Sequence, residues 1–174
     1  DLAVFVITGD GDALSIGGNH LIHAMRRNVN LTILMFNNRI YGLTKGQFSP
    51  TSEKGWKTST SPDGSAEAPV QPLALALTHG ATFVGRGYPG EIKHLIWLIG
   101  EAMEHPGYAL LDILQPCVTF NKPRAYDYYS ERVYKLDDEP DYDPSNRTAA
   151  WERAQEWGDR IPIGIFYRAT PGPT

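Results

Sequence analysis

The chain has 174 residues, 41% of them hydrophobic and 21% charged, which suffices for one globular domain with a packed core. Its formal net charge of −4 gives no reason to expect nucleic acid or an anionic membrane as a partner. A single cysteine excludes an internal disulfide framework, and we expect a cytoplasmic protein because no 18-residue apolar run and no signal peptide are found.

Two apolar runs in the first part of the chain predict buried parallel strands. They cover residues 2–7 and 31–36, are rich in branched side chains and end at glycine or polar residues. Residues 15–27 between them carry an apolar stripe and end in two arginines, which predicts a crossover helix. The first run should be buried on both faces and is not preceded by a methionine, so we expect that an N-terminal portion is missing.

Polar residues follow directly after both strands. Asp10 comes after the first strand and Asn38 after the second, and ligands of parallel sheets gather at the carboxyl ends of the strands. A carboxylate and a carboxamide offer the hard oxygen ligands that Mg²⁺ and Ca²⁺ prefer. Gly9 and Gly11 let the backbone approach a bulky anion. The sequence therefore predicts a magnesium diphosphate site.

Three alternatives for this stretch fit it less well. An Asp-Gly pair after a strand is often a hairpin turn, but residues 17–20 do not form a return strand. Asp10 and Asp12 begin like a calcium loop, although its third acidic position, its glycine and its closing glutamate are absent. The glycines also do not have the GxGxxG spacing of a dinucleotide-binding fingerprint.

Residues 37–70 predict a long loop, because Ser, Thr, Lys, Gly and Pro dominate them. Loops of this length usually have a function or are disordered. We expect Lys54 and Lys57 to be solvated. Lys45 follows Asn38 by seven residues and is expected to stay near the bound ligand.

The chain then alternates between helices and strands. Helices are predicted over residues 72–80 and 90–105, and strands over residues 81–85 and 108–114. The second helix is amphipathic, and we expect it to pack on the sheet through Ile92, Leu95, Ile96, Ile99 and Met103. The alternation predicts an α/β fold with a doubly wound, mostly parallel sheet.

The composition changes after residue 117. Tyrosines interleave with charges, Asn146 is placed to cap a helix that extends to Trp157, and residues 161–167 should be extended. We interpret residues 1–117 as the binding domain. Residues 118–174 are then an aromatic-rich C-terminal extension that packs on its own domain or on a partner subunit.

Two motifs carry a resemblance to known enzymes. The GDG motif at residues 9–11, followed by the NN pair at residues 37–38, resembles the thiamine diphosphate enzymes. The block YGLTKGQFSPT at residues 41–51 looks like the β subunit of the 2-oxoacid:ferredoxin oxidoreductases, which include the pyruvate and 2-oxoglutarate enzymes. The resemblance extends to about residue 167, and its specific motifs lie in residues 9–51 and at Cys117.

The resemblance implies a thiamine diphosphate-binding fold with assigned residues. Mg²⁺ would be bound by Asp10, Asn38 and the backbone carbonyl of Ile40. Lys45 would recognise the substrate carboxylate, and Cys117 would be one ligand of a [4Fe–4S] cluster whose other three cysteines precede the GDG motif. The cofactor contacts implied are Gly9, Asp10, Gly11, Asp12, Asn38, Ile40, Gly42, Leu43 and Thr44.

The implied activity is oxidative decarboxylation of a 2-oxoacid to an acyl-CoA, with electrons passed through the iron–sulfur cluster to ferredoxin. The implied partner is the α subunit, or a fused γ/α subunit, which supplies the glutamate that activates the cofactor. Two alternatives remain open. A non-oxidative thiamine diphosphate enzyme, of the decarboxylase or acetohydroxyacid synthase type, would not need Cys117. A non-catalytic binding module would lose the metal ligands, whereas Asp10 and Asn38 are both present.

Overall fold

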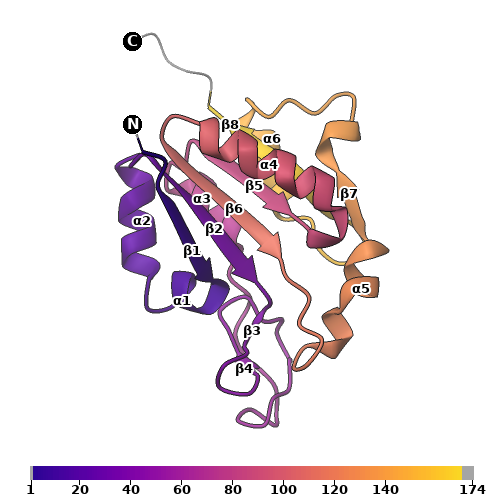
Figure 1. Cartoon of the computed structure of the whole chain (residues 1–174). Coiled ribbons are helices and arrows are strands. Elements are labelled where there is room, and N and C mark those ends of the chain that lie inside the picture. The colour runs from indigo at the N-terminus through magenta and orange to yellow at the C-terminus, as the bar shows by residue number, and fades with distance from the viewer. Residues whose placement is uncertain (1, 170–174) are drawn as a thin grey trace.

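The computed structural model describes residues 2–169, which form a six-stranded sheet with helices on both faces (Figure 1). The strands of this sheet are β1 Phe5–Gly9, β2 Leu31–Asn37, β5 Phe83–Gly87, β6 Tyr108–Leu114, β7 Val133–Lys135 and β8 Ile161–Arg168. Their order in the sheet is β1-β2-β6-β5-β8-β7, and β8 pairs antiparallel with β5 whereas the other neighbours are parallel. A separate hairpin consists of β3 Ile40–Tyr41 and β4 Gln47–Phe48.

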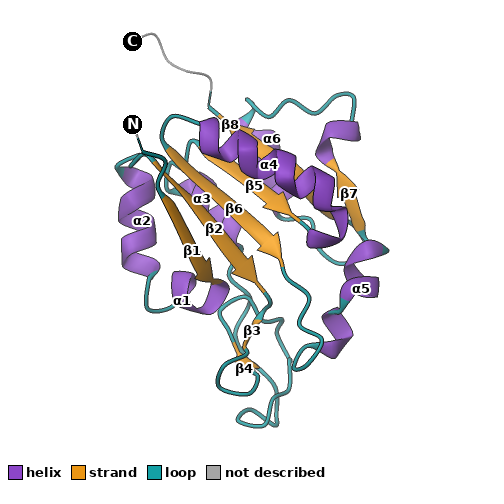
Figure 2. Ribbon diagram, viewed as in Figure 1, coloured by secondary structure: helices purple, strands orange, loops and turns teal. Residues whose placement is uncertain are grey.

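The helices cover both faces of the sheet, which confirms the predicted doubly wound α/β fold (Figure 2). They are α1 Asp10–Leu14, α2 Gly18–Arg26, α3 Pro72–Thr78, α4 Ile92–Glu104, α5 Tyr126–Ser130 and α6 Arg147–Ala154. Short 3₁₀ turns lie at Pro89–Glu91, Lys122–Arg124 and Leu136–Asp138. Apolar side chains of α2, α3 and α6 pack on one face of the sheet, and those of α4 pack on the other.

The central strand β6 shows why this sequence forms a buried parallel sheet. Every residue of β6 is buried, as expected for a strand covered on both faces. Side chains alternate between the faces, so Leu110 contacts the α2/α3/α6 side and Leu111 contacts the α4 side. Asp112 is a charged residue in this otherwise apolar strand, and it lies opposite Arg86 of β5.

The prediction that the first strand is buried on both faces is wrong for the described residues. β1 is an edge strand that pairs only with β2, and 72% of Ile7 is exposed. Phe5 and Val6 are exposed too. The apolar composition predicts a strand correctly, but it does not reveal which elements cover that strand.

The crossover helix predicted over residues 15–27 is confirmed as α2, and a short helix that was not predicted, α1, precedes it. α1 starts at Asp10, immediately after β1, and α2 starts at Gly18. A Cβ atom at Gly17 would lie 2.7 Å from the backbone oxygen of Asp12, so the tight connection requires a glycine. The additional helix α1 places Asp10 in the first turn of a helix rather than in a loop.

The helix predicted over residues 90–105 is α4, but the apolar stripe that we expected to face the sheet is wrong in part. Leu95, Leu98 and Ala102 of α4 are buried against the sheet, whereas 63% of Ile96 is exposed. Two apolar stripes overlap on this helix, and periodicity alone does not decide which of them faces the sheet. The other exposed members of the predicted stripe are Ile92 and Met103.

The C-terminal residues complete the same sheet. The predicted extended segment is β8, which pairs with β5, and the predicted cap is confirmed because the Asn146 side chain accepts hydrogen bonds from the backbone of Thr148 and Ala149. The capped helix α6 ends at Ala154, three residues before the predicted end. It starts as predicted because Asn146 satisfies amide groups that have no partner within the helix.

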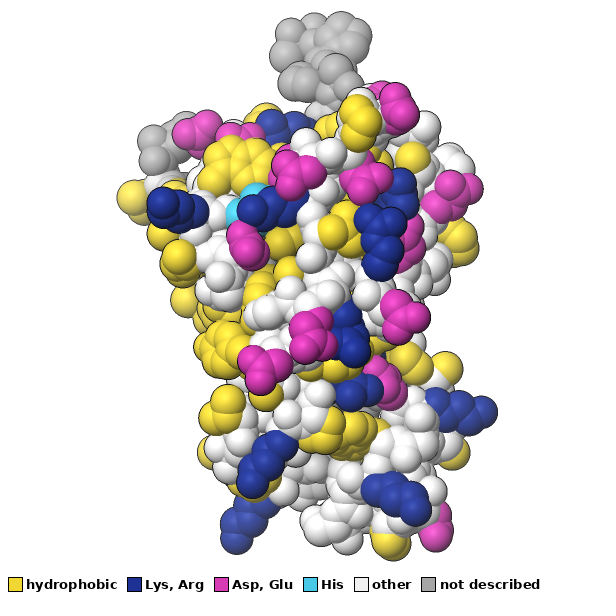
Figure 3. Space-filling view, turned by 90° about the vertical axis from the view of Figure 1, so that its right-hand side faces the viewer, with side chains coloured by type: hydrophobic (Ala, Val, Ile, Leu, Met, Phe, Trp, Pro, Cys, Tyr) yellow, Lys and Arg dark blue, Asp and Glu magenta, His cyan; other side chains and the backbone are white. Residues whose placement is uncertain are grey.

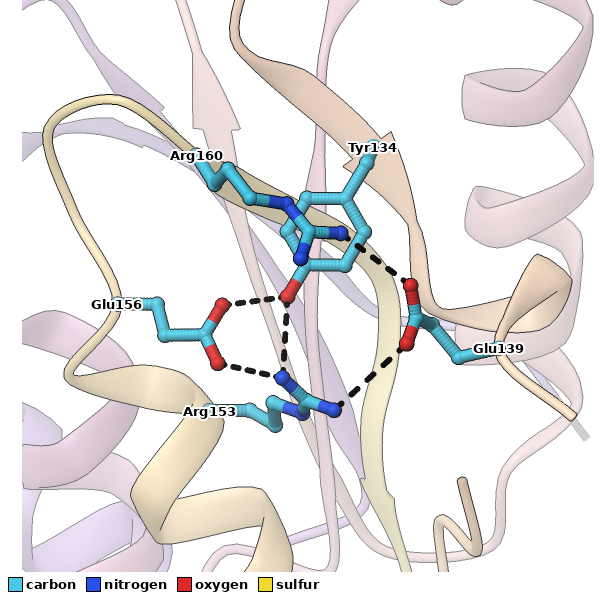
Figure 4. Close-up of polar contacts among 5 residues, drawn as sticks. All are labelled: Tyr134, Glu139, Arg153, Glu156 and Arg160. Carbon is cyan, nitrogen blue, oxygen red and sulfur yellow. Dashed lines mark hydrogen bonds and ion pairs between the residues drawn. The ribbon is translucent and has the colours of Figure 1, made fainter. Parts of the chain in front are cut away.

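A polar cluster fastens these C-terminal elements to one another (Figure 4). The Arg160 guanidinium stacks on the ring of Tyr134, with its carbon atom 4.0 Å from the ring centroid. Glu139 lies between Arg160 and Arg153, at 3.3 and 3.8 Å. Arg153 also pairs with Glu156 at 2.6 Å. Because the five residues come from β7, α6 and the segments beside them, they hold this part of the chain together.

No helix within residues 2–169 combines the length and the apolar character needed to span a membrane. Acidic and basic side chains are mixed over the face shown in Figure 3, and Lys and Arg side chains predominate at its lower end, below the sheet.

Candidate functional site

The residues that follow β1 and β2 lie at one edge of the sheet. The two strands are parallel neighbours, so their carboxyl ends are adjacent, and Asp10 and Asn38 come directly after them. The β3–β4 hairpin and its loop lie beyond this edge, at the lower end of Figure 1. The fold therefore brings together the two side chains that the sequence predicts as metal ligands, although 28 residues separate them.

Asp10 is a buried carboxylate without a cationic partner among the described residues. Only 1% of it is exposed, and its Oδ2 atom accepts hydrogen bonds from Ser49 at 2.5 Å and Thr51 at 2.6 Å. Burial raises the pKa of Asp10 above its usual value, although the two hydroxyl groups lower it in part. The backbone of Asn38 also hydrogen-bonds to this carboxyl group, and a buried carboxylate of this kind is stabilised by a cation.

Asn38 lies in a tight turn that leads into β3. Its Oδ1 atom accepts a hydrogen bond from the backbone N–H of Ile40 at 3.0 Å, and its backbone oxygen accepts one from the Asn121 side chain at 2.9 Å. Arg39, which lies between Asn38 and Ile40 in the sequence, has a left-handed φ of 63°. The Arg39 guanidinium stacks on Trp157 at 4.1 Å, which helps to hold this conformation.

The carboxylate of Asp10, the carboxamide of Asn38 and the backbone carbonyl of Ile40 form a set of oxygen ligands that suits Mg²⁺. Residues 2–169 contain no group of three or more His, Cys, Asp or Glu placed to hold a metal ion. Mg²⁺ does not need such a group, since it is usually held by one or two carboxylates together with phosphate oxygens and water. The buried, unpaired charge of Asp10 beside Asn38 and Ile40 therefore fits a magnesium ion that also carries a phosphate ligand.

Gly11 is required by its neighbour Tyr41. A Cβ atom at Gly11 would lie 2.3 Å from the Tyr41 ring, whose hydroxyl donates a hydrogen bond to the Gly11 oxygen at 3.3 Å. The sequence predicts that this glycine admits an anion, whereas in the structure the tyrosine occupies the space. Gly9 has no comparably close neighbour.

The tip of the β3–β4 hairpin is exposed, unlike the groups around Asp10. Leu43, Thr44 and Lys45 are exposed, and Gly42 precedes them. Lys45 has a left-handed φ of 76° and forms no ion pair within the described part of the chain. Lys45 is therefore an exposed residue of the loop beyond the sheet edge, and its expected role stays a prediction.

Asp12 and Cys117 lie at the margins of the site. Asp12 is exposed on α1. Cys117 is half-buried just after β6, and its backbone oxygen accepts a hydrogen bond from Asn121 at 3.1 Å. Since the Asn121 side chain bonds to the backbone of Asn38, the segment around Cys117 is tied to the candidate metal site.

The structure adds residues that the sequence analysis missed. Ser49 and Thr51 contact Asp10, and Asn37 joins Thr51 to Asp112 through bonds of 3.0 and 2.9 Å. One signal was available, because Asp112 is the only charged residue in the apolar run of β6. Hydroxyl residues of a loop carry no comparable signal.

Two protein families match this chain, one over its first two thirds and one over the rest. The family described as "Thiamine pyrophosphate enzyme, C-terminal TPP binding domain" matches residues 1–113, so the chain belongs to the thiamine pyrophosphate enzymes. The family that describes the C-terminal part of the pyruvate ferredoxin oxidoreductase β subunit matches residues 117–174. Within that class, the chain belongs with the β subunits of the 2-oxoacid:ferredoxin oxidoreductases, as the resemblance predicts.

Individual relatives agree with this assignment. The 2-oxoacid:ferredoxin oxidoreductase β subunit of Saccharolobus solfataricus is 47% identical over 96% of this chain and 58% of its own length. The 2-oxoglutarate oxidoreductase subunit KorB of Mycobacterium tuberculosis is 60% identical over 70% of this chain and 32% of its own length. A 2-oxoglutarate:ferredoxin oxidoreductase structure from Magnetococcus marinus, with 2-oxoglutarate, coenzyme A and succinyl-CoA bound, is 45% identical with a TM-score of 0.92. That alignment covers 100% of this chain and 59% of the solved one, so the chain spans less than two thirds of these relatives.

Proposed function

We propose that this chain holds magnesium thiamine diphosphate in the β subunit of an enzyme that converts a 2-oxoacid and coenzyme A to an acyl-CoA and CO₂. Two electrons per turnover pass through an iron–sulfur cluster to ferredoxin. The observation that carries the proposal is the buried carboxylate of Asp10, which lacks a cation among residues 2–169 and lies beside Asn38 at adjoining strand ends. When bound, thiamine diphosphate supplies the carbon nucleophile and the electron sink for decarboxylation.

In this proposal the chain's own residues bind and orient the cofactor. Asp10, the side chain of Asn38 and the carbonyl of Ile40 hold Mg²⁺, which in turn holds the diphosphate. Further contacts come from the backbone and side chains around the two strand ends. These residues are Gly9, Gly11, Asp12, Gly42, Leu43 and Thr44.

Lys45 is proposed to bind the carboxylate of the 2-oxoacid. Its ammonium group is exposed on the loop beyond the sheet edge, where no acidic side chain of the described chain pairs with it. Relatives named for 2-oxoglutarate make that compound a substrate to test beside pyruvate. The α subunit, or a fused γ/α subunit, and ferredoxin are the proposed protein partners.

Cys117 is proposed to supply one ligand of a [4Fe–4S] cluster. Such a cluster takes about four thiolates, and this chain contains a single cysteine, so the residues present here do not hold a cluster by themselves. The full-length subunit should contain about four irons, and Cys117→Ser should lower its iron content and visible absorbance while cofactor binding persists. Unchanged iron content in the variant would identify Cys117 as a packing residue and would favour a non-oxidative enzyme.

The metal site is tested by calorimetric titration of the assembled full-length enzyme with thiamine diphosphate and Mg²⁺. Asp10→Ala should abolish Mg²⁺-dependent binding, because it removes the one anionic ligand, and Asn38→Ala should weaken binding less. Asp63→Ala, which removes an exposed loop carboxylate, is the matched control and should bind as the wild type does. Undiminished binding in Asp10→Ala would refute the proposed site.

A further inference from the structure

Three hydroxyl residues of one turn in the long loop are buried, whereas the lysines of the loop are exposed. Ser49, Thr51 and Ser52 are each less than 5% exposed. The Ser52 hydroxyl accepts a hydrogen bond from the Ser49 backbone at 2.8 Å and donates one to the Arg39 oxygen at 2.5 Å. Buried polar groups in a loop need such partners, and these two hydrogen bonds join the turn to the segment that follows β2.

The hydroxyl groups of this turn hold the carboxylate of Asp10. Ser49 and Thr51 lie 2.5 and 2.6 Å from the same atom, Oδ2, and 3.1 Å from each other. Two donors on one carboxylate oxygen fix the orientation of the carboxyl plane. Neither hydroxyl group contacts Oδ1, and the backbone of Asn38 hydrogen-bonds to the same carboxyl group, so the metal ion is expected at Oδ1 on the side of Asn38.

The centre of the sheet supports this turn. Thr51 Oγ1 lies 3.0 Å from Asn37 Oδ1, and its single proton serves either Asn37 or Asp10 at one time. The amide group of Asn37 donates to Asp112 at 2.9 Å, and Asp112 pairs with Arg86 at 3.1 Å. All of these residues are more than nine-tenths buried, so the network connects Asp10 to the buried centre of the sheet.

We propose that Ser49 and Thr51 are positioning residues that present Asp10 to the metal ion, and that metal binding thereby orders the loop that carries Lys45. The proposal rests on the proposed function, since it concerns the same metal site. A metal ion on Oδ1 fixes the carboxylate that the two hydroxyl groups contact, and this favours the buried conformation of the turn. By reciprocity, the ordered turn raises the affinity for the metal ion.

A purely structural role for the hydroxyl groups makes a different prediction. In that case the turn has the same conformation with and without metal, and loss of one hydroxyl lowers the stability of both states equally. The affinity for Mg²⁺ would then be unchanged. The two roles are therefore separated by metal affinity and by the metal dependence of loop protection.

The first measurement is the Mg²⁺ affinity of the full-length assembled enzyme at saturating thiamine diphosphate. Thr51→Val keeps the shape of the side chain and removes the hydroxyl, and it should weaken Mg²⁺ binding about 10- to 100-fold, the range typical for residues that orient a metal ligand. Thr51→Ser keeps the hydroxyl and should bind close to the wild type. Thr60→Val, an exposed threonine of the same loop, is the control and should have no effect.

The second measurement is cleavage by a lysine-specific protease. Lys45, Lys54 and Lys57 are exposed in the loop and report on its order. Magnesium thiamine diphosphate should slow cleavage of the wild type and of Thr60→Val. In Thr51→Val the protection should be lost at a Mg²⁺ concentration that saturates the wild type, and it should return at a concentration about 10- to 100-fold higher.

Each result decides the proposal. Wild-type Mg²⁺ affinity in a folded Thr51→Val variant overturns it and leaves the proposed function intact. If Thr51→Val does not fold, Ser49→Ala provides the same comparison at the second hydroxyl. Cofactor binding that leaves the wild-type loop equally cleavable overturns the coupling to the loop. No Mg²⁺-dependent binding to any form, the wild type included, overturns the proposed function and this inference together.

Discussion

The ion pair between Arg86 and Asp112 is buried, so the loss of unfolding free energy on breaking it should be large. Both side chains are 1% exposed, the Arg86 Nε and Asp112 Oδ2 atoms are 3.1 Å apart, and the residues are opposite each other on adjacent strands. Arg86→Met would leave Asp112 buried with only the hydrogen bond from Asn37 to compensate its charge. Breaking a buried pair in this way costs about 3–5 kcal/mol of unfolding free energy, because a charge remains without a partner in a medium that solvates it poorly.

The matched control is a pair with similar geometry at the surface. Arg160 lies 3.3 Å from Glu139, but 61% of its side chain is exposed. Arg160→Met should therefore cost no more than about 1 kcal/mol. Urea unfolding of the full-length subunit, followed by tryptophan fluorescence, measures both variants. If the two substitutions cost the same, the claim that burial determines the value of the Arg86 pair is refuted.

Four further predictions follow from single sites. Gly11→Ala should force the Tyr41 ring to move, with a loss of about 1–3 kcal/mol of stability and weaker cofactor binding by calorimetry. Asn146→Ala should lower the unfolding free energy by about 1 kcal/mol, because two backbone amide groups at the start of α6 lose their acceptor; urea unfolding measures it. Lys45→Ala should raise KM or lower kcat/KM for the 2-oxoacid and leave cofactor affinity unchanged, whereas unaltered kinetics on both pyruvate and 2-oxoglutarate would refute its role. Burial and the Glu156 contact raise the pKa of Tyr134 to about 12, so stability present below pH 10 should be lost as the pH rises from about 10 to about 12, and urea unfolding of Tyr134→Phe should show a smaller decline over that range.

The parts of the fold that the sequence predicts well are those specified by local chemistry. The apolar residues of β6, the Asn146 cap and the proline at the start of α3 each determine their element with little help from distant residues. The adjacency of Asp10 and Asn38 was predictable as well, because consecutive parallel strands place their carboxyl ends side by side.

Other features depend on contacts between distant segments and had no local signal. The exposed face of α4 is as apolar as a core stripe, so only the position of the sheet reveals that Leu98 rather than Ile96 is buried. The contacts of Ser49 and Thr51 with Asp10 span about 40 residues and require the loop to turn back to the strand end. Serine and threonine are common in loops, and their number does not indicate which of them are buried.

We propose that the ends of β1 and β2 hold the metal ion of magnesium thiamine diphosphate. Anomalous diffraction tests this directly, with the full-length enzyme crystallised with thiamine diphosphate and Mn²⁺, which accepts the same oxygen ligands as Mg²⁺. We expect one strong peak within about 2–2.3 Å of the Asp10 carboxylate, the Asn38 carboxamide and the Ile40 carbonyl, in contact with the diphosphate. A bound diphosphate whose metal peak lies away from Asp10 and Asn38 would contradict it.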